Sequence, residues 1–200
     1  MPRRFGIGFD QKIMTIEPTA LPGVYICTPI VHEDERGFFM ESYRQDAFAE
    51  AGITDVFVQD NHSRSVRNTV RGLNFQWDPP MAKLMRVTQG SAFLVAVDIR
   101  KNSPTLGRWI GIEASAENKK QLYAPVGFAR GFQTLTDNCE VQYKCSALYK
   151  KEGEGEIVWN DPDIGIVWPI REAPIVSERS KIAPTLKEWL ARPESDSFIY

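Results

Sequence analysis

Short runs of β-branched and aromatic residues alternate with turns rich in Gly, Pro, Asn and Asp from residue 56 to about residue 168. Runs of this kind between such turns are typical of β-strands. The clearest examples are Lys83–Thr88, Ser91–Ile99, Gln121–Ala124, Gly131–Leu135 and Val141–Leu148. Many short strands with regular turns predict an all-β sandwich, barrel or jelly roll, and the pattern alone does not separate these three.

The two ends of the chain depart from this pattern. Residues 1–20 are mixed in character and allow either a loose segment or a strand that pairs with another subunit. Gly23–Thr28 reads as a strand, and Ser42–Gly52 as a short helix ended by its glycine. Residues 183–192 predict a short amphipathic helix that Pro193 ends.

Side chains should alternate between two faces in the run from Val141 to Tyr149, because successive residues of a strand point in opposite directions. The mainly apolar face, which we expect to point into the interior, contains Val141, Tyr143, Cys145, Ala147 and Tyr149. The interior of a jelly roll can hold a ligand. The pattern therefore leaves two interpretations of the tyrosines open: core residues with satisfied hydroxyl groups, or side chains that face a ligand.

Composition narrows the class of protein. A chain of 200 residues with 42% apolar and 25% charged residues suits one globular domain over residues 1–200. No apolar run approaches the roughly 20 residues of a membrane span, and the N-terminus lacks an apolar stretch of signal-peptide type. Three cysteines without metal-ligand spacing favour reduced thiols in the cytoplasm. The net charge of −2 argues against nucleic-acid binding.

Several motifs follow one another in a fixed order. They are Arg71–Gln76 (RGLNFQ), Ala82–Leu84, Val97–Arg100, Ser103–Gly107 and Pro125–Phe132. In that order they resemble the cupin-fold 3,5-epimerases of nucleotide 4-keto-6-deoxysugars, the dTDP-4-dehydrorhamnose 3,5-epimerase family. The resemblance covers roughly residues 20 to 184. It implies an all-β cupin jelly-roll (double-stranded β-helix) barrel with short peripheral helices.

The resemblance also implies catalytic roles for Tyr143, Lys83 and Arg71, and Asn74 is the fourth catalytic residue we expect. Tyr143 aligns with the family's catalytic tyrosine, which would donate a proton or, as tyrosinate, accept one. Lys83 matches the lysine that neutralises the enolate, and Arg71 would anchor phosphate or stabilise the enolate oxygen. Arg71 and Asn74 are three residues apart, which would normally place them on opposite faces of a strand. A bulge or kink at Gly72 would bring both inward.

The chain departs from the family at three positions. Asn74 stands where the family has its catalytic histidine, and an amide cannot remove a carbon-bound proton as imidazole can. Ser180 stands where the family has the aspartate that supports this histidine. Arg130 replaces the histidine of an Ala-His-Gly-Phe motif. Loss of both the catalytic histidine and its supporting aspartate within otherwise intact motifs favours altered chemistry, in which Asn74 orients the substrate. A structural role and a remnant of lost catalysis are the alternatives for Asn74.

Other matches imply contacts to the nucleotide sugar. The stretch Asp34–Glu41 resembles a D-x-R-G-x-F-x-E signature, and Gln59–Ser65 resembles Q-x-N-x-S-x-S. The substrate-binding residues we expect are Arg36, Phe39, Glu41, Gln59, Asn61, Arg130, Tyr149 and Ser180. Neither His32 nor His62 is expected at the reacting carbon. Because no pair of histidines has metal-ligand spacing, we expect no catalytic metal.

These matches predict an epimerase of a nucleotide-linked 4-keto-6-deoxyhexose, acting at C3 alone or at C3 and C5. It would remove a proton α to the ketone and return one on the opposite face, and this chemistry needs no cofactor. Such an inversion requires a proton-transfer group on each face of the sugar, and the second group is not evident from the sequence. A ketoisomerase and a non-catalytic nucleotide-sugar-binding protein are the alternatives. The nucleotide and the final sugar product stay open.

The expected partners are the nucleotide diphosphate sugar and a second copy of the chain, with no nucleic acid and no membrane. The resemblance implies a homodimer in which N-terminal strands pack against the neighbouring barrel. Arg36 or Phe39 would then complete the partner's site.

Overall fold

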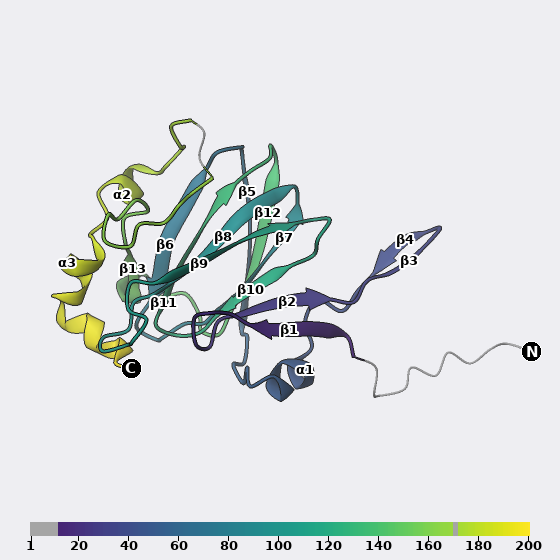
Figure 1. The fold of residues 1–200 in the computed structure, drawn as a ribbon, viewed down its shortest axis with the longest axis horizontal. Coiled ribbons are helices and arrows are strands. Elements are labelled where there is room, and N and C mark those ends of the chain that lie inside the picture. Colours follow the sequence, from purple (N-terminus) through teal and green to yellow (C-terminus); the bar gives the residue numbers. More distant parts are fainter. Residues whose placement is uncertain (1–11, 170–171) are drawn as a thin grey trace, which may run out of the picture.

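Two antiparallel sheets form the body of the protein in a computed structural model that describes residues 12–169 and 172–200 (Figure 1). The six-stranded sheet contains, in spatial order, β1 (Met14–Pro18), β2 (Tyr25–Pro29), β10 (Gln121–Ala124), β7 (Lys83–Gln89), β12 (Cys139–Cys145) and β5 (Gln59–Ser65). The five-stranded sheet contains β13 (Glu154–Glu156), β6 (Val70–Gln76), β11 (Phe128–Thr134), β8 (Ser91–Asp98) and β9 (Trp109–Ser115). The sheets face each other as a jelly roll, and all five predicted runs overlap a strand.

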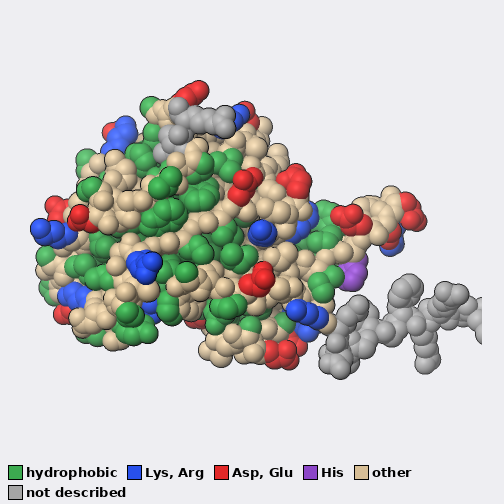
Figure 2. Space-filling view, viewed as in Figure 1, with side chains coloured by type: hydrophobic (Ala, Val, Ile, Leu, Met, Phe, Trp, Pro, Cys, Tyr) green, Lys and Arg blue, Asp and Glu red, His purple; other side chains and the backbone are tan. Residues whose placement is uncertain are grey.

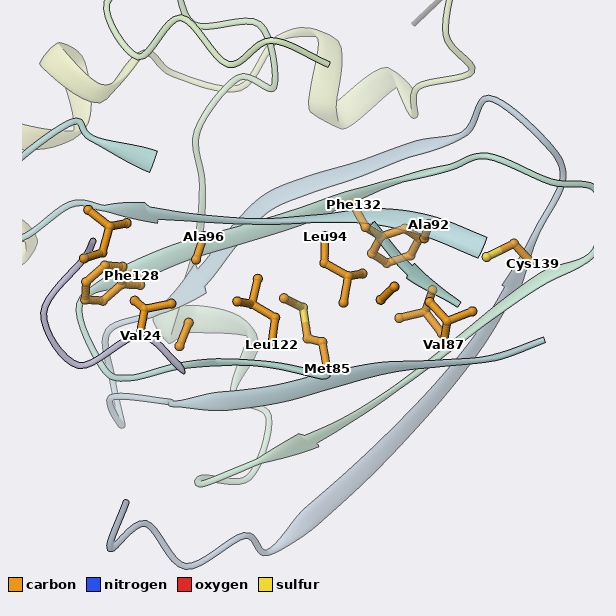
Figure 3. Packing of buried hydrophobic residues seen from close by; sticks show 14 residues of the cluster. Val24, Met85, Val87, Ala92, Leu94, Ala96, Leu122, Phe128, Phe132 and Cys139 are labelled. Atoms are coloured by element: carbon orange, nitrogen blue, oxygen red, sulfur yellow. The ribbon is translucent and has the colours of Figure 1, made fainter. Parts of the chain in front are cut away.

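The main core lies between the two sheets. Figure 3 shows Leu94 and Phe132 of the five-stranded sheet pointing toward Met85 and Leu122 of the six-stranded sheet. These side chains are almost completely removed from water. Packing of this kind fixes the distance between the sheets and so the width of any space left between them.

Strand β8 is buried on both faces, which explains its continuous apolar sequence. Ala92, Leu94 and Ala96 point into the main core, whereas Val95 and Val97 belong to a second cluster on the outer face. A layer formed by the C-terminal residues covers that outer face. It includes α3 (Leu186–Leu190) and the 3-10 helix η2 (Pro193–Phe198), which follow the short helix α2 (Glu178–Lys181) in the chain.

The predicted C-terminal helix is confirmed as α3, with shorter bounds. Thr185 and Glu188 form a capping box at its start. Its buried residues are Leu186 and Trp189, and the Trp189 ring centroid lies 4.5 Å from that of Phe75 on β6. The helix therefore packs against the outer face of the five-stranded sheet, while the inner face of that sheet packs in the main core.

An arm formed by β3 (His32–Asp34) and β4 (Gly37–Phe39) projects away from the body (Figure 1). Figure 2 shows that this hairpin, called the arm below, carries charged side chains of both signs. It leads into α1 (Gln45–Glu50), within the predicted helix at residues 42–52. Strand β1 pairs with β2 of the same chain. The proposed pairing of residues 1–20 with another subunit is not tested, and residues 1–11 lie outside the described part.

The predicted strand from Val141 to Tyr149 is too long. Its first part is confirmed: Val141 and Cys145 are fully buried, and Tyr143 packs against the main core. The strand ends at Cys145 because Ser146 turns to bond Ala82, with its amide donating to the Ala82 carbonyl and its Oγ accepting from the Ala82 amide. Tyr149 lies beyond this turn and is 54% exposed, so its expected interior position is wrong.

The chain then passes through the 3-10 helix η1 (Lys151–Gly153) into β13. Among the described residues, none of the helices has the length and apolar character needed to cross a membrane.

Candidate active site

A cavity of about 460 Å³ opens between the two sheets, close to β6, β7, β11, β12 and β13. Residues 175–180, which include the start of α2, form one side of it. Its lining is unusually rich in charge. The polar and ionisable residues at its wall include Arg71, Asn74, Lys83, Arg130, Tyr143, Glu154, Glu156, Arg179 and Ser180. All four predicted catalytic residues, together with Arg130 and Ser180, are thus brought to one cavity.

A bulge at Gly72 brings Arg71 and Asn74 to this cavity, as the sequence predicted. Phe132 of β11 faces Arg71 and Arg130 faces Asn74, so β6 has one more residue than its partner between these pairs. Gly72 has φ +109°, and a Cβ at this position would lie 2.5 Å from the Arg130 carbonyl oxygen. Only glycine fits this conformation and this close approach.

Arg130, Asn74 and Glu156 form a row across β11, β6 and β13. Asn74 is the direct cross-strand partner of both Arg130 and Glu156. Directly opposed residues of neighbouring strands present their side chains on the same face of the sheet. Here that face is the cavity wall, since all three residues line it.

Lys83 and Tyr143 lie on the neighbouring strands β7 and β12 of the other sheet. The Lys83 Nζ lies 4.9 Å from the centroid of the Tyr143 ring. Burial, followed by the positive charge of Arg130, lowers the pKa of Lys83 to about 8. An ammonium with this pKa exchanges a proton readily near neutral pH.

Arg130 is only 3% exposed. Its Nε donates to the Phe128 carbonyl at 3.2 Å, and both terminal nitrogens donate to the carbonyl of Met81. Burial lowers its pKa to about 10. No carboxylate in the described part of the chain forms a salt bridge with it, and the hydrogen bonds that hold it go to main-chain carbonyls. A contact to substrate phosphate or hydroxyl stays a prediction.

Arg179 holds two carboxylates at the cavity wall. Its Nη1 lies 2.7 Å from Glu154 Oε2, and its Nε lies 3.2 Å from Glu156 Oε2. Ser180, the next residue, is buried, and its Oγ lies 2.8 Å from that of Ser177, which caps α2. The lining therefore has four basic side chains and two carboxylates, an excess of positive charge that favours an anionic ligand.

Glu154 and Glu156 line the cavity but were not predicted as site residues. The signal that would have found them is the alternation Glu152-Gly153-Glu154-Gly155-Glu156, which predicts carboxylates on one face of a strand. Only the pairing of β13 with β6 shows that this face meets the cavity.

Six predicted substrate-binding residues lie outside the cavity lining. The exposed arm carries Arg36 and Phe39, and Phe39 is 68% exposed. Arg36 pairs with Asp34 of the same arm, and Glu41 lies 3.5 Å from the Arg44 guanidinium.

The remaining three residues form a chain of contacts at the edge strand β5. Gln59 Nε2 donates to Asn61 Oδ1 at 2.9 Å, and Gln59 Oε1 accepts from the Tyr149 amide. The Tyr149 hydroxyl donates to Glu154 Oε2 at 3.2 Å, and this contact links the group to the cavity wall. Substrate contacts by these residues stay predictions.

Neither histidine of the chain lines the cavity. His32 lies on the exposed arm, and the exposed His62 has its Nε2 3.0 Å from Glu140 Oε2 on the edge of the sheet. Neither imidazole therefore occupies the place of the base that the family resemblance leaves empty at Asn74.

Comparison with known proteins identifies the family. The family model for dTDP-4-dehydrorhamnose 3,5-epimerase matches residues 18–188. The chain is 49% identical over 180 residues to the dTDP-4-dehydrorhamnose 3,5-epimerase of Salmonella typhimurium, covering 89% of this chain and 98% of that one. The chain belongs to the dTDP-4-dehydrorhamnose 3,5-epimerase family.

Solved structures place this family member in the cupin jelly-roll fold. The dTDP-6-deoxy-D-glucose-3,5-epimerase of Legionella pneumophila, solved with dTDP-4-keto-L-rhamnose, matches with a TM-score of 0.87 and 42% identity. That match covers 91% of this chain and 96% of the other. A 3′-monoepimerase of Streptomyces bikiniensis, solved with dTDP-quinovose, matches with a TM-score of 0.81 and 34% identity, covering 86% and 87%. The solved relatives thus include a 3,5-epimerase and a 3′-monoepimerase.

Proposed function

We propose that the protein epimerises a nucleotide-linked 4-keto-6-deoxyhexose in deoxysugar biosynthesis. The observation that carries this proposal is the Lys83–Tyr143 pair, which faces the row Arg130–Asn74–Glu156 across a cavity in a member of an epimerase family. Solved relatives hold dTDP sugars, so the thymidine diphosphate form is the first substrate to test.

The chemistry follows from the charge of the cavity. A 4-ketone acidifies the hydrogens on C3 and C5, and removal of either one leaves an enolate. Lys83 and Arg71 present positive charge at the wall where the oxygen of the enolate would lie, and Arg130 adds a fixed buried charge. Stabilisation of this developing negative charge lowers the barrier to proton removal. The Tyr143 hydroxyl then supplies a proton to carbon.

Asn74 limits what the site does. As an amide it donates and accepts hydrogen bonds and stays uncharged, so it orients a hydroxyl or the ketone of the sugar. Without imidazole at this position we propose inversion at one carbon, C3.

The arm supplies the nucleotide contacts from a second subunit in this proposal. Arg36, Phe39 and Glu41 lie outside the cavity lining of their own chain, and Phe39 is exposed although aromatic. A guanidinium suits a diphosphate and an aromatic ring suits a nucleobase. A homodimer in which each arm completes the neighbouring site explains both features. Three buried free cysteines suit the reducing cytoplasm, where we place the protein.

Proton NMR with dTDP-4-keto-6-deoxyglucose in D2O tests the proposal, because it resolves the C3 and C5 protons separately. Loss of the C3 signal alone is the expected result. Exchange at both carbons would make the protein a 3,5-epimerase. A shifted carbonyl would indicate a ketoisomerase, and bound sugar without any exchange would indicate a binding protein.

A further inference from the structure

We propose that the carboxylate of Glu156 is the proton acceptor of this site and faces Tyr143 across the sugar. The inference rests on the proposed epimerase activity, and it supplies the second proton-transfer group that the sequence does not reveal. Inversion of a carbon centre requires removal of a proton from one face and its return on the other. The two groups must therefore stand on opposite sides of the substrate.

The two sheets provide this arrangement. Tyr143 belongs to β12 of the six-stranded sheet, and Glu156 belongs to β13 of the five-stranded sheet. Both side chains line the same cavity. A sugar between the sheets would therefore present one face to the phenol and the other to the carboxylate.

Glu156 also lies beside the position that lost its imidazole. It is the direct cross-strand partner of Asn74, and both side chains are on the cavity face. Partners of this kind have Cβ atoms about 5 Å apart. The distance is short enough for a carboxylate on β13 to reach the volume above Asn74.

The environment of Glu156 suits a base. Its side chain is 6% exposed, so little water competes for it. Arg179 Nε lies 3.2 Å from Oε2 and fixes the orientation of the carboxylate, while Oε1 has no hydrogen-bond partner in the described ranges. An ionised carboxylate with one unengaged oxygen accepts a proton from a correctly placed carbon acid.

Glu154 is the other carboxylate at the cavity wall, and its contacts suit the role of proton acceptor less well. Its Oε2 takes both the Arg179 ion pair at 2.7 Å and the Tyr149 hydroxyl at 3.2 Å. Its side chain is 19% exposed, about three times as much as that of Glu156. Glu154 therefore acts as the support that fixes Arg179, and Arg179 in turn orients Glu156.

The proton balance is complete with groups present in the site. Oε1 of Glu156 takes the proton from the carbon next to the ketone, and the electron pair of the C–H bond forms the C=C bond of the enolate. The carbonyl π electrons move to the ketone oxygen, which Lys83 and Arg71 stabilise. The carbon then takes the proton of the Tyr143 hydroxyl from the other face. Exchange with solvent returns a proton to the tyrosinate and removes one from Glu156.

The decisive experiment compares Glu156→Gln with wild type for deuterium uptake from D2O into dTDP-4-keto-6-deoxyglucose. Glutamine keeps the shape and an oxygen for Arg179 but cannot accept the proton, so we expect uptake to fall by about 10²–10⁴-fold. Glu152→Gln is the matched control, since Glu152 is an exposed carboxylate of the same segment, outside the cavity. Its uptake should equal that of wild type, and all three proteins should share one melting temperature.

A second variant distinguishes loss of the proton acceptor from a folding defect. Glu156→Ala opens space beside Arg179, and added formate can then supply the missing carboxylate. Recovery of uptake with formate, in a protein that still binds dTDP, supports a chemical role. Absence of recovery in such a protein contradicts it.

The outcomes also separate the two proposals. Wild-type uptake in Glu156→Gln would overturn the role of Glu156 and leave the epimerase proposal standing. No uptake by the wild type itself would overturn the epimerase proposal and, with it, the role of Glu156.

Discussion

The ammonium of Lys83 lies 4.9 Å from the ring centroid of Tyr143, on the strand next to it. This contact places the cation that would stabilise the enolate oxygen beside the phenol that would protonate the enolate carbon. In the proposed reaction the two groups would act on the two ends of the O–C=C unit of the enolate, which the spacing of β7 and β12 matches. The side of the cavity formed by β7 and β12 therefore suits the step in which the enolate is reprotonated.

The pKa of Lys83 sets an upper pH limit on activity. Burial and the charge of Arg130 lower it to about 8, so the protonated fraction of Lys83 falls as pH rises through that value. If the charged form stabilises the enolate as proposed, kcat/KM should fall about tenfold per pH unit above 8. The pH profile of kcat/KM for proton exchange measures this limb.

Lys83→Arg should move the limb to higher pH, because arginine stays charged in this range. Lys187→Arg on the exposed surface of α3 is the control and should leave the profile unchanged. A limb near pH 8 that persists in Lys83→Arg would assign it to another group.

Gly72→Ala should disrupt both stability and the site. Its Cβ would lie 2.5 Å from the Arg130 carbonyl oxygen and 2.7 Å from the Gly131 Cα, at a φ of +109°. We expect a loss of about 3 kcal/mol or more in the free energy of unfolding, measured by denaturant titration. Gly165→Ala separates the causes, since Gly165 also has positive φ but its nearest neighbour is 3.9 Å away. It should cost roughly 1–2 kcal/mol, and equal losses in both variants would argue against a steric role for the bulge.

The exposed arm predicts complementation between two inactive variants. Arg36→Ala would remove a nucleotide contact given to the neighbouring subunit, whereas Tyr143→Phe would remove the acid of the subunit that carries it. When both chains are produced together, half of the dimers are mixed, and each mixed dimer contains one intact site. Activity of about one quarter of wild type is then expected for the mixture, against almost none for either variant alone. A mixture as inactive as its components would mean that each chain completes its own site.

Restoring the histidine and aspartate that the family has at positions 74 and 180 tests whether the rest of the cavity can still support 3,5-epimerisation. Asn74 and Ser180 line the same cavity from β6 and α2, so Asn74→His with Ser180→Asp introduces imidazole and carboxylate at its wall. We expect C5 exchange to appear beside C3 exchange in the same NMR assay. Asn74→His alone, which lacks the supporting carboxylate, should gain less. No gain in the double variant would indicate that Arg130 has reshaped the site for another substrate.

The strands and the bulge were predictable because their signals are local. Turn residues bound each strand, and one glycine between Arg71 and Asn74 was enough to predict that both face inward. The family motifs then predicted which side chains would gather, and Tyr143, Lys83, Arg71 and Asn74 do line one cavity.

Features that depend on long-range pairing were not predictable in the same way. Glu156 reaches the cavity only because a strand of three residues pairs with β6, and neither its length nor its register has a strong local signal. Tyr149 continued the alternation of β12 in sequence, yet a side-chain contact to Ala82 ends the strand four residues earlier. Position on an exposed arm, as for Phe39, is likewise set by the fold as a whole.

The buried charge of Arg130 is fixed by the main chain. Main-chain carbonyls of Met81 and Phe128 hold its guanidinium group in place. The cavity therefore contains an electric field directed at the place of the substrate, and binding requires little reorientation of dipoles. Because the source of this field is buried and anchored to the backbone at Met81 and Phe128, changes in surface charge or ionic strength should hardly alter it.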